Sequence, residues 1–195
     1  MPVSQAEVGI AHLTQGRADL RETLRRETRA QHDRLDAMMA DMPMGDDADY
    51  RRFLAIQYRA RQPVEAWLAQ NAESGMTPPP QCPALAADLA ELGAPVPESD
   101  ASFAAPDGSD LGVAWVLAGS SLGNRTLLKQ RTKAGLDGPT RFLSCSVMPD
   151  FFRHLLATMN RAHAPAQSDA AVAGARAVFS LFEREAAHAV AEDAR

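Results

Sequence analysis

The sequence is short of the residues that build sheets, disulfide frameworks and membrane spans. Aromatic residues make up only 6% of its 195 positions, and the β-branched residues that favour strands are rarely consecutive. Its two cysteines, Cys82 and Cys145, are too few for a disulfide framework, and we interpret them as reduced thiols of a cytoplasmic protein. No apolar run approaches the roughly 20 residues that a membrane-spanning helix needs. The formal net charge of −5 gives no electrostatic reason to expect a nucleic-acid partner.

The remaining composition favours helices. Hydrophobic residues make up 46% of the chain and alanine is abundant, which is typical of an all-α protein. We predict a single-domain, multi-helical fold of about six helices, because this length suits one sizeable core. The opening stretch MPVSQAEVGIAHLTQG lacks the charged start and apolar run of a signal peptide. We therefore expect residues 1–17 to be a flexible lead-in and residues 18–192 to form the domain.

The hydrophobic spacing predicts where these helices lie. An amphipathic helix is expected from about Asp19 to Asp41, because its leucines and methionines share one arc of about 100°. Asp46 and Asp47 offer N-caps for a second helix that bends near Pro63. The later elements expected are a loop through SGMTPPPQCP, a helix from Cys82 to Leu92 closed by Gly93, a glycine-bearing helix from near Asp110, a helix over about Asp150–Ala162 with Pro149 in its first turn, and a last helix capped by Ser168 or Asp169. The state of the apolar stretch TRFLSCSV stays open.

The stretch GSSLGN, residues 119–124, places two glycines inside an otherwise apolar helix. Each glycine in a helix interior costs roughly 0.5–1 kcal/mol relative to alanine. Gly119 and Gly123 therefore indicate a kink, a tight helix–helix contact or a backbone that approaches a ligand closely. The stretch follows no predicted strand, which argues against a phosphate-binding glycine loop.

One of the five histidines, His32, has a distinctive setting. On a helical wheel of about 100° per residue it lies at the edge of the apolar arc, with Arg25, Arg29 and Asp36 on the adjoining flank. An apolar floor, an imidazole and two guanidinium groups on one face suit a flat apolar ligand that bears carboxylates. The simpler interpretation is a boundary histidine that bonds a carbonyl or water. No pair of histidines has the spacing of a local zinc site.

Two stretches, in this order, resemble a known family. The segment RETLRRETRAQHDRLDAMM resembles the first helix of the heme oxygenases, where a Leu-(Lys/Arg)-x-x-Thr-x-x-x-His pattern delivers the axial ligand of the heme iron. The segment AWVLAGSSLGNRTLL is similar to their distal helix, whose bacterial form runs roughly Tyr-Val-x-x-Gly-Ser-x-Leu-Gly-(Gly/Ala). The resemblance covers about residues 19–190. It implies a heme-oxygenase-like fold with heme sandwiched between the first helix and a kinked glycine-bearing helix.

The resemblance also implies roles for the residues of the first helix. It makes His32 the proximal ligand of the heme iron. Asp36, one turn on, would partner the other ring nitrogen directly or through a bridging water. Arg25 and Arg29 map to the family's basic residues near the heme propionates, and Arg153 on the penultimate helix falls near another such position. The alternative for each arginine is an ordinary solvated helix face.

The glycines gain a reason from the same resemblance. A helix that crosses directly over heme brings its backbone close to the iron's ligand, and a side chain at Gly119 or Gly123 would collide there. Ser120 takes the place of an aspartate in the animal enzymes, so proton supply would depend on water and serine hydroxyls. The alternative is that both glycines serve helix packing alone. Asn124 departs from the family's glycine or alanine: facing heme it would alter ligand access or the carbon attacked, and facing away it would be harmless.

The leading functional hypothesis is an enzyme that cleaves heme, with dioxygen and reductant, to biliverdin, carbon monoxide and ferrous iron. Electrons would come from an external ferredoxin or reductase, because no flavin or nicotinamide fingerprint is present. Bacterial members pass biliverdin to an acceptor such as a phytochrome, or release iron. One alternative, motivated by Asn124, is a heme carrier or sensor that uses His32 without turnover. Another is a helical interaction protein that binds no heme.

The dipeptide Cys82-Pro83 matches the minimal Cys-Pro motif of heme-responsive thiolates. A dipeptide is weak support for such a site, and the ordinary interpretation is a loop thiol that precedes a helix.

Overall fold

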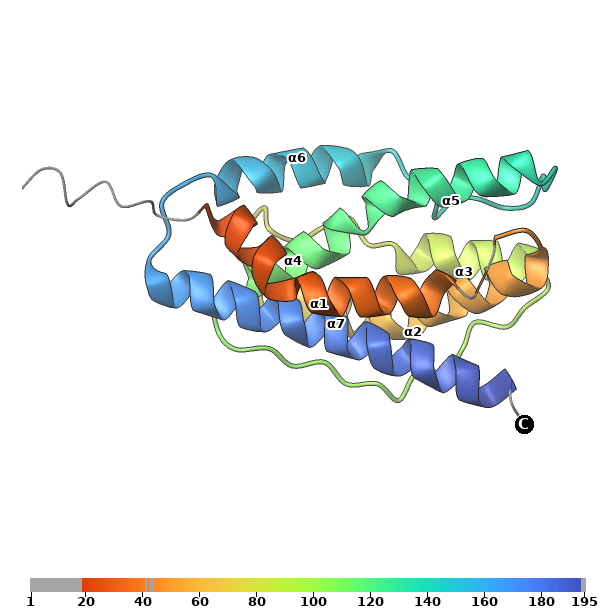
Figure 1. The fold of residues 1–195 in the computed structure, drawn as a ribbon, viewed down its shortest axis with the longest axis horizontal. Coiled ribbons are helices and arrows are strands. Elements are labelled where there is room, and N and C mark those ends of the chain that lie inside the picture. Colours follow the sequence, from red (N-terminus) through yellow and green to blue (C-terminus); the bar gives the residue numbers. More distant parts are fainter. Residues whose placement is uncertain (1–18, 41, 43, 194–195) are drawn as a thin grey trace, which may run out of the picture.

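The structure, a computed structural model, describes residues 19–40, 42 and 44–193, and these form helices and connections without a strand (Figure 1). The prediction of an all-α fold is confirmed. The helices are α1 (Leu20–Ala40), α2 (Asp47–Asn71), α3 (Cys82–Glu91), α4 (Asp110–Gly119), α5 (Ser121–Lys133), α6 (Val147–Met159) and α7 (Pro165–Asp193). The predicted lead-in, residues 1–17, lies outside the described residues. None of the described helices combines the length and apolarity that crossing a membrane requires.

The long helix α7 organises the bundle. It packs along α1 and crosses α4, and it also contacts α2 (Figure 1). Helices α5 and α6 run along the upper edge of the same view, on the side of α1 away from α7. Helix α1 follows the predicted bounds closely and buries Leu20 and Leu24 in the core, while the buried Thr28 hydroxyl donates to the Leu24 carbonyl at 2.8 Å.

Helix α2 begins as its capping chemistry predicts. The Asp46 carboxylate accepts a hydrogen bond from the Asp49 amide at 2.8 Å, which satisfies one of the unpaired amides of the first turn. The helix continues through Pro63, which has no N–H to donate to the Arg59 carbonyl one turn earlier. The Ser99 hydroxyl donates to that carbonyl instead, at 3.2 Å, so the helix interior tolerates the proline.

The polar connection after α3 lies against α2. Gly93 ends α3 with a positive φ of 71°, a left-handed conformation that glycine adopts without strain, as predicted. Downstream, the Phe103 ring packs edge-on against Trp67 of α2, with centroids 5.6 Å apart. The connection over 94–109 is therefore held to the bundle although it forms no helix.

The apolar stretch before α6 forms turns that are fixed by one buried carboxylate. Asp88 of α3 is fully buried and accepts hydrogen bonds from the backbone amides of Arg141 and Phe142 at 3.1 and 3.0 Å. The Arg141 guanidinium also donates to it at 3.1 Å. This convergence of donors satisfies a buried charge and places Phe142 in the core.

The last two helices begin earlier than predicted. Helix α6 starts at Val147, because Met148 is buried in the core and draws the first turn inward, and it ends at Met159. The predicted cap of α7 at Ser168 or Asp169 is wrong. Pro165 occupies the first helical position. The amide of Ala164, just before the helix, donates to the Gln167 side chain at 2.8 Å.

Helices α4 and α7 cross at a contact that only glycine permits. A Cβ added to Gly112 would lie 1.8 Å from the carbonyl oxygen of Ala171, which is backbone and cannot rotate away. A Cβ on Gly174 would lie 2.7 Å from both the Cβ and the carbonyl oxygen of Ser109. The two helix backbones therefore approach as closely as they can at this point.

We predict that Gly112→Ala destabilises the apoprotein by about 3 kcal/mol or more, because the helices must separate to admit the methyl group. The measurement is urea unfolding followed by circular dichroism. Gly123→Ala is the matched control, since no described atom lies within 4 Å of a Cβ there; it should leave stability unchanged or raise it by about 0.5–1 kcal/mol. Equal destabilisation of the two variants would contradict the packing argument.

Candidate functional site

His32 lies on the outer face of α1, at the boundary between core and solvent. Its side chain is 58% exposed, and its Nδ1 lies 3.1 Å from a carboxylate oxygen of Asp36, one turn on. The ring meets Phe179 of α7 edge-on, with centroids 6.0 Å apart. Its Nε2 has no hydrogen-bond partner among the described residues. The imidazole is thus oriented by two neighbours while one nitrogen is left for a ligand.

The backbone that carries His32 is fixed by ion pairs to α7 on both sides. One turn before the histidine, Arg176 donates to the Glu27 carboxylate at 2.7 Å and to the Glu27 carbonyl at 3.2 Å. Just after it, Arg34 pairs with Glu183 at 3.0 Å. Exposed pairs contribute little stability individually. Together with Phe179 they fix the rotation of α1 against α7, and hence the direction of the imidazole.

The GSSLGN stretch interrupts the predicted helix at one residue. Ser120 separates α4 from α5, and the amide of Gly123 bonds back only three residues, to the Ser120 carbonyl at 3.1 Å. The hydroxyls of Ser120 and Ser121 donate to the carbonyls of Leu117 and Ala118 at 2.8 and 2.6 Å. Serines that bond back one turn bend helices. The expected kinked, glycine-bearing helix is therefore present.

The two glycines of this stretch have different surroundings. A Cβ on Gly119 would touch the Phe152 ring at 3.7 Å, an ordinary contact, whereas no described atom lies within 4 Å of a Cβ on Gly123. Packing within the described residues therefore does not require Gly123. Leu122 beside it is 58% exposed, so this part of α5 faces solvent among the described residues.

Asn124, which departs from the family pattern, is turned into the protein. Its side chain is buried, and its amide nitrogen donates to the Phe142 carbonyl at 3.3 Å. The hydrogen bond ties α5 to the turns before α6. The orientation of Asn124 relative to a bound heme stays a prediction.

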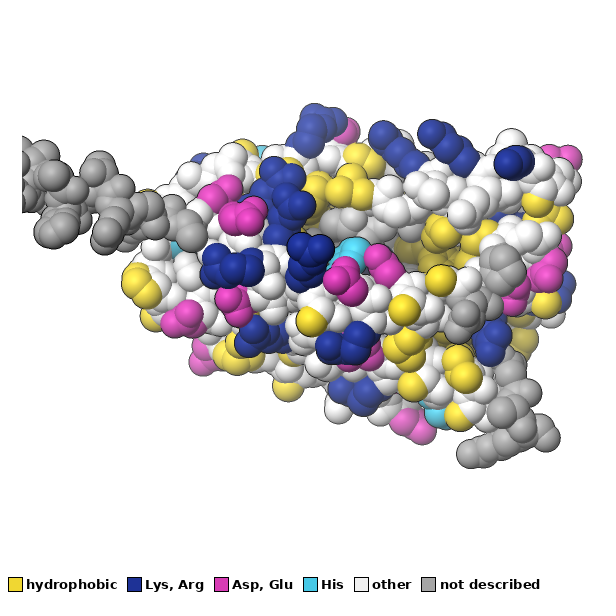
Figure 2. Space-filling model, viewed as in Figure 1, with side chains coloured by type: hydrophobic (Ala, Val, Ile, Leu, Met, Phe, Trp, Pro, Cys, Tyr) yellow, Lys and Arg dark blue, Asp and Glu magenta, His cyan; other side chains and the backbone are white. Residues whose placement is uncertain are grey.

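An apolar surface lies between α1 and α5. Among the half-buried side chains that pack against one hydrophobic cluster, five come from these two helices: Leu35, Met38, Met39, Leu127 and Leu128. Figure 2 shows hydrophobic side chains gathered here, with acidic and basic side chains around them. A cavity of about 560 Å³ lies elsewhere, at the start of α1 and the turn between α6 and α7, and His32 does not line it.

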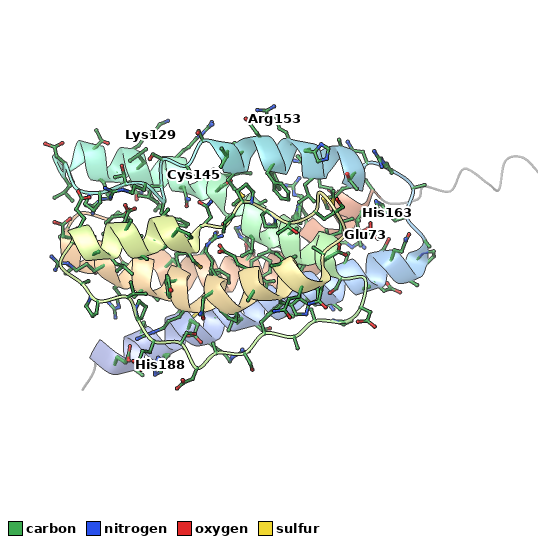
Figure 3. All side chains as sticks on the ribbon, turned by 180° about the vertical axis from the view of Figure 1, so that it is seen from behind. Glu73, Lys129, Cys145, Arg153, His163 and His188 are labelled. Carbon is green, nitrogen blue, oxygen red and sulfur yellow. The ribbon has the colours of Figure 1, made fainter. Side chains whose placement is uncertain are left out.

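The predicted anionic-ligand residues are all exposed. Arg25 lies on the solvent side of α1, and Arg29, whose side chain is 82% exposed, lies 3.7 Å from Asp33. Arg153 pairs with Asp150 and points outward from α6, away from the other helices (Figure 3). The two arginines of α1 share the helix of His32, whereas Arg153 is directed away from it. Their contacts with a bound carboxylate remain predictions.

Sequence reasoning missed one residue beside the helix interruption. Arg61 of α2 is fully buried, and its Nη2 donates to the Ser120 hydroxyl. The available signal was its position in α2, where it falls among buried residues that are apolar except for Gln57, one turn earlier. A charged residue in such surroundings is uncommon and points to a specific partner.

Comparisons with known proteins agree with this arrangement. The chain is 33% identical over 118 residues to the heme oxygenase PigA of Pseudomonas aeruginosa, an alignment that covers 56% of this chain and 60% of that relative. The heme oxygenase of Neisseria meningitidis, solved with NO and CO bound, matches with a TM-score of 0.71 and 22% identity, over 88% of this chain and 92% of that one. The fold is that of the heme oxygenases. No protein-family model matches the sequence.

Within this heme oxygenase fold, Cys82 is an unsuitable thiolate. The Glu65 carboxylate accepts the amides of Gln81 and Cys82 at 2.8 and 3.3 Å, which caps the start of α3. Burial, together with the charge and hydrogen bond of Glu65, raises the pKa of the Cys82 thiol well above its ordinary value. The thiol therefore stays protonated at neutral pH, which argues against the Cys-Pro interpretation.

We predict that Cys82 resists alkylation in the native protein at pH 8, since the neutral thiol is a poor nucleophile. The measurement is the reaction of Cys145→Ser, whose single remaining thiol is Cys82, with iodoacetamide before and after unfolding in urea. Adding Glu65→Gln should speed the native reaction, because loss of the negative charge lowers the thiol pKa. Equal native and unfolded rates would contradict the predicted pKa shift.

Proposed function

We propose that this chain is a heme oxygenase, which cleaves heme to biliverdin, carbon monoxide and ferrous iron. The observation that carries the proposal is the pairing of His32 with Asp36 on α1, a helix that shares a hydrophobic cluster with α5, which begins directly after the interruption at Ser120. The heme oxygenase fold and the curated relative support it.

The residues present fit a heme. Heme is a flat, largely apolar molecule, and the side chains of α1 and α5 that border the shared cluster are aliphatic or thioether. An imidazole whose Nδ1 is engaged presents Nε2 as the donor that heme iron prefers. No described atom lies within 4 Å of a Cβ built on Gly123, so the space that a side chain would fill there is open. Each observation concerns this chain's own atoms.

In this proposal each residue has a physical task. When bound, heme with its iron supplies the oxidation chemistry. His32 would hold the heme iron through Nε2, and the Asp36 carboxylate would accept a hydrogen bond from Nδ1–H, which fixes the tautomer and the ring orientation. Gly119 and Gly123 keep side chains away from the face opposite His32. The Ser120 hydroxyl at the interruption donates to the Leu117 carbonyl and accepts from Arg61, so one lone pair of its oxygen can still accept a hydrogen bond.

The basic residues of the rim complete the proposed site. Guanidinium groups bind carboxylates in bidentate geometry, so Arg25 and Arg29 of α1 would orient the heme propionates. Arg153 joins them only with a change of rotamer, because it points outward. Dioxygen and an external electron donor, a ferredoxin or a reductase, are the other reactants. A biliverdin acceptor such as a phytochrome and a cytoplasmic location remain expectations from the resemblance.

The carrier or sensor alternative is motivated by the departure of Asn124 from the family pattern. The Asn124 side chain is buried and donates to the Phe142 carbonyl, which supports the enzyme over this alternative.

We predict that His32→Ala abolishes normal axial ligation of hemin, because it removes the proposed donor nitrogen. The measurements are the Soret band of the hemin complex and a single turnover in air with an added electron donor. Wild-type protein should bleach the Soret band and form biliverdin, whereas the variant should show a shifted band and no bilin. Imidazole added to the variant should move its band back toward that of the wild type.

The control is His154→Ala, which removes an exposed histidine of α6 and should leave both spectra unchanged. A spectrum unaffected by His32→Ala would overturn the ligand assignment. A wild-type hemin complex that never forms bilin would overturn the proposed activity.

We predict that Gly123→Ala weakens hemin binding without destabilising the apoprotein. In the apoprotein the alanine gains helix propensity and meets no described atom. In the hemin complex its methyl group occupies space that the ligand needs, so affinity should fall by about tenfold, the equivalent of about 1.4 kcal/mol. Hemin titration measures the loss. Gly45→Ala, also in open space, is the control and should bind normally; an equal affinity for the two variants would leave Gly123 without a ligand role.

A further inference from the structure

The core contains two fully buried arginines with different partners. Arg131 is 0% exposed and pairs directly with the Asp47 carboxylate at 2.7 Å, while its guanidinium stacks 3.9 Å from the Tyr50 ring. Arg61 is 1% exposed and forms no ion pair with a described carboxylate. A buried charge that lacks an ion pair is costly, so its position calls for an explanation.

The Arg61 guanidinium is held by neutral groups from α2, α7, the interruption at Ser120 and the turns before α6. Its Nε donates to the Gln57 side chain at 3.1 Å, and its carbon lies 5.1 and 6.0 Å from the rings of Phe142 and Phe182. Its Nη2 donates to the Ser120 hydroxyl, and its Nη1 has no hydrogen-bond partner among the described residues. Apart from Gln57 on its own helix, Ser120 is therefore the only described residue that forms a hydrogen bond with this guanidinium.

We propose that Arg61 is a positioning residue that fixes the interruption between α4 and α5 through Ser120. The inference rests on the proposed function, because the interrupted segment is the one expected to cross the heme. The guanidinium makes the Ser120 hydroxyl a hydrogen-bond acceptor while that hydroxyl donates to the Leu117 carbonyl at 2.8 Å. Ser120 is thus tied on one side to α2 and on the other to α4.

A second tether holds the other end of the same segment. Asn124 donates to the Phe142 carbonyl, and the Phe142 ring lies beside Arg61. Residues 120–124 are therefore held at both ends by one cluster, with Gly123 between the two tethers. The cluster sets the height and tilt of this backbone over a bound heme, and with it which porphyrin carbon is open to attack and how readily a distal ligand enters.

The test compares Arg61→Met with Arg131→Met in the full-length hemin complex. Both variants remove a buried guanidinium that stacks on an aromatic ring and leaves one nitrogen unpaired, so both should lower thermal stability. Only Arg61→Met should change the proportions of the biliverdin isomers and the cyanide dissociation constant of the ferric complex, the latter by about fivefold. Arg61→Lys, which keeps a donor, should restore part of the wild-type pattern.

Ser120→Ala provides the second variant if Arg61→Met does not fold. It should change isomer proportions and cyanide binding in the same direction as Arg61→Met. Combining the two substitutions should add little, because both remove the same Arg61–Ser120 hydrogen bond. Its control is Thr132→Ala, which removes a hydroxyl that bonds back along α5 without an arginine partner.

The outcomes separate the inference from the proposed function. A wild-type protein that fails to bind hemin overturns the proposed function, whatever the variants do. A wild-type protein that binds hemin without turnover still reports on Arg61 through cyanide binding. If Arg61→Met and Ser120→Ala match their controls in every readout of the hemin complex, Arg61 is only a structural residue and the inference is wrong.

Discussion

The close crossing of α4 and α7 is the contact on which both halves of the candidate site depend. Gly112 and Gly174 lie where the two backbones meet, and a side chain at either would overlap the other helix. Beyond this crossing, α7 places Phe179 against the His32 ring and forms ion pairs with α1. On its other side, α4 leads directly to the interruption at Ser120. One helix therefore fixes an imidazole and a glycine turn relative to each other, although almost 90 residues separate them in the chain.

The sequence predicts most of the fold because helix starts and stops have local causes. The Asp46 cap and the left-handed Gly93 were identifiable from residue type and spacing, and both are found. The start of α6 was missed because it depends on burial of Met148, which is a tertiary contact. Serine is on average a strong N-cap, so the sequence favours a start at Ser168. The predicted start is wrong because Pro165 and the Gln167 side chain together form an effective cap three residues earlier.

The candidate site divides in the same way. The contact of His32 with Asp36 joins residues four apart on one helix, so the spacing alone predicted it. The hydrogen bond of Arg61 to Ser120 joins residues 59 apart, and helical periodicity on either segment says nothing about the other. The orientation of Asn124 also depends on a distant carbonyl, because its partner lies on a turn whose path is fixed by the buried Asp88 carboxylate. Local chemistry thus identified the ligand candidate, but not the cluster that holds the opposite helix.

Gly112 and Gly123 both carry the conformational cost of a glycine in a helix, but for different physical reasons. Gly112 is required by the protein itself, because the Ala171 carbonyl occupies the place of its Cβ. Gly123 is not required in this way, and helix propensity alone would favour alanine there. In the proposed function, the volume of a bound heme would account for a glycine at this position, between two tethered residues. Contacts within the described residues do not explain the conformational cost of Gly123.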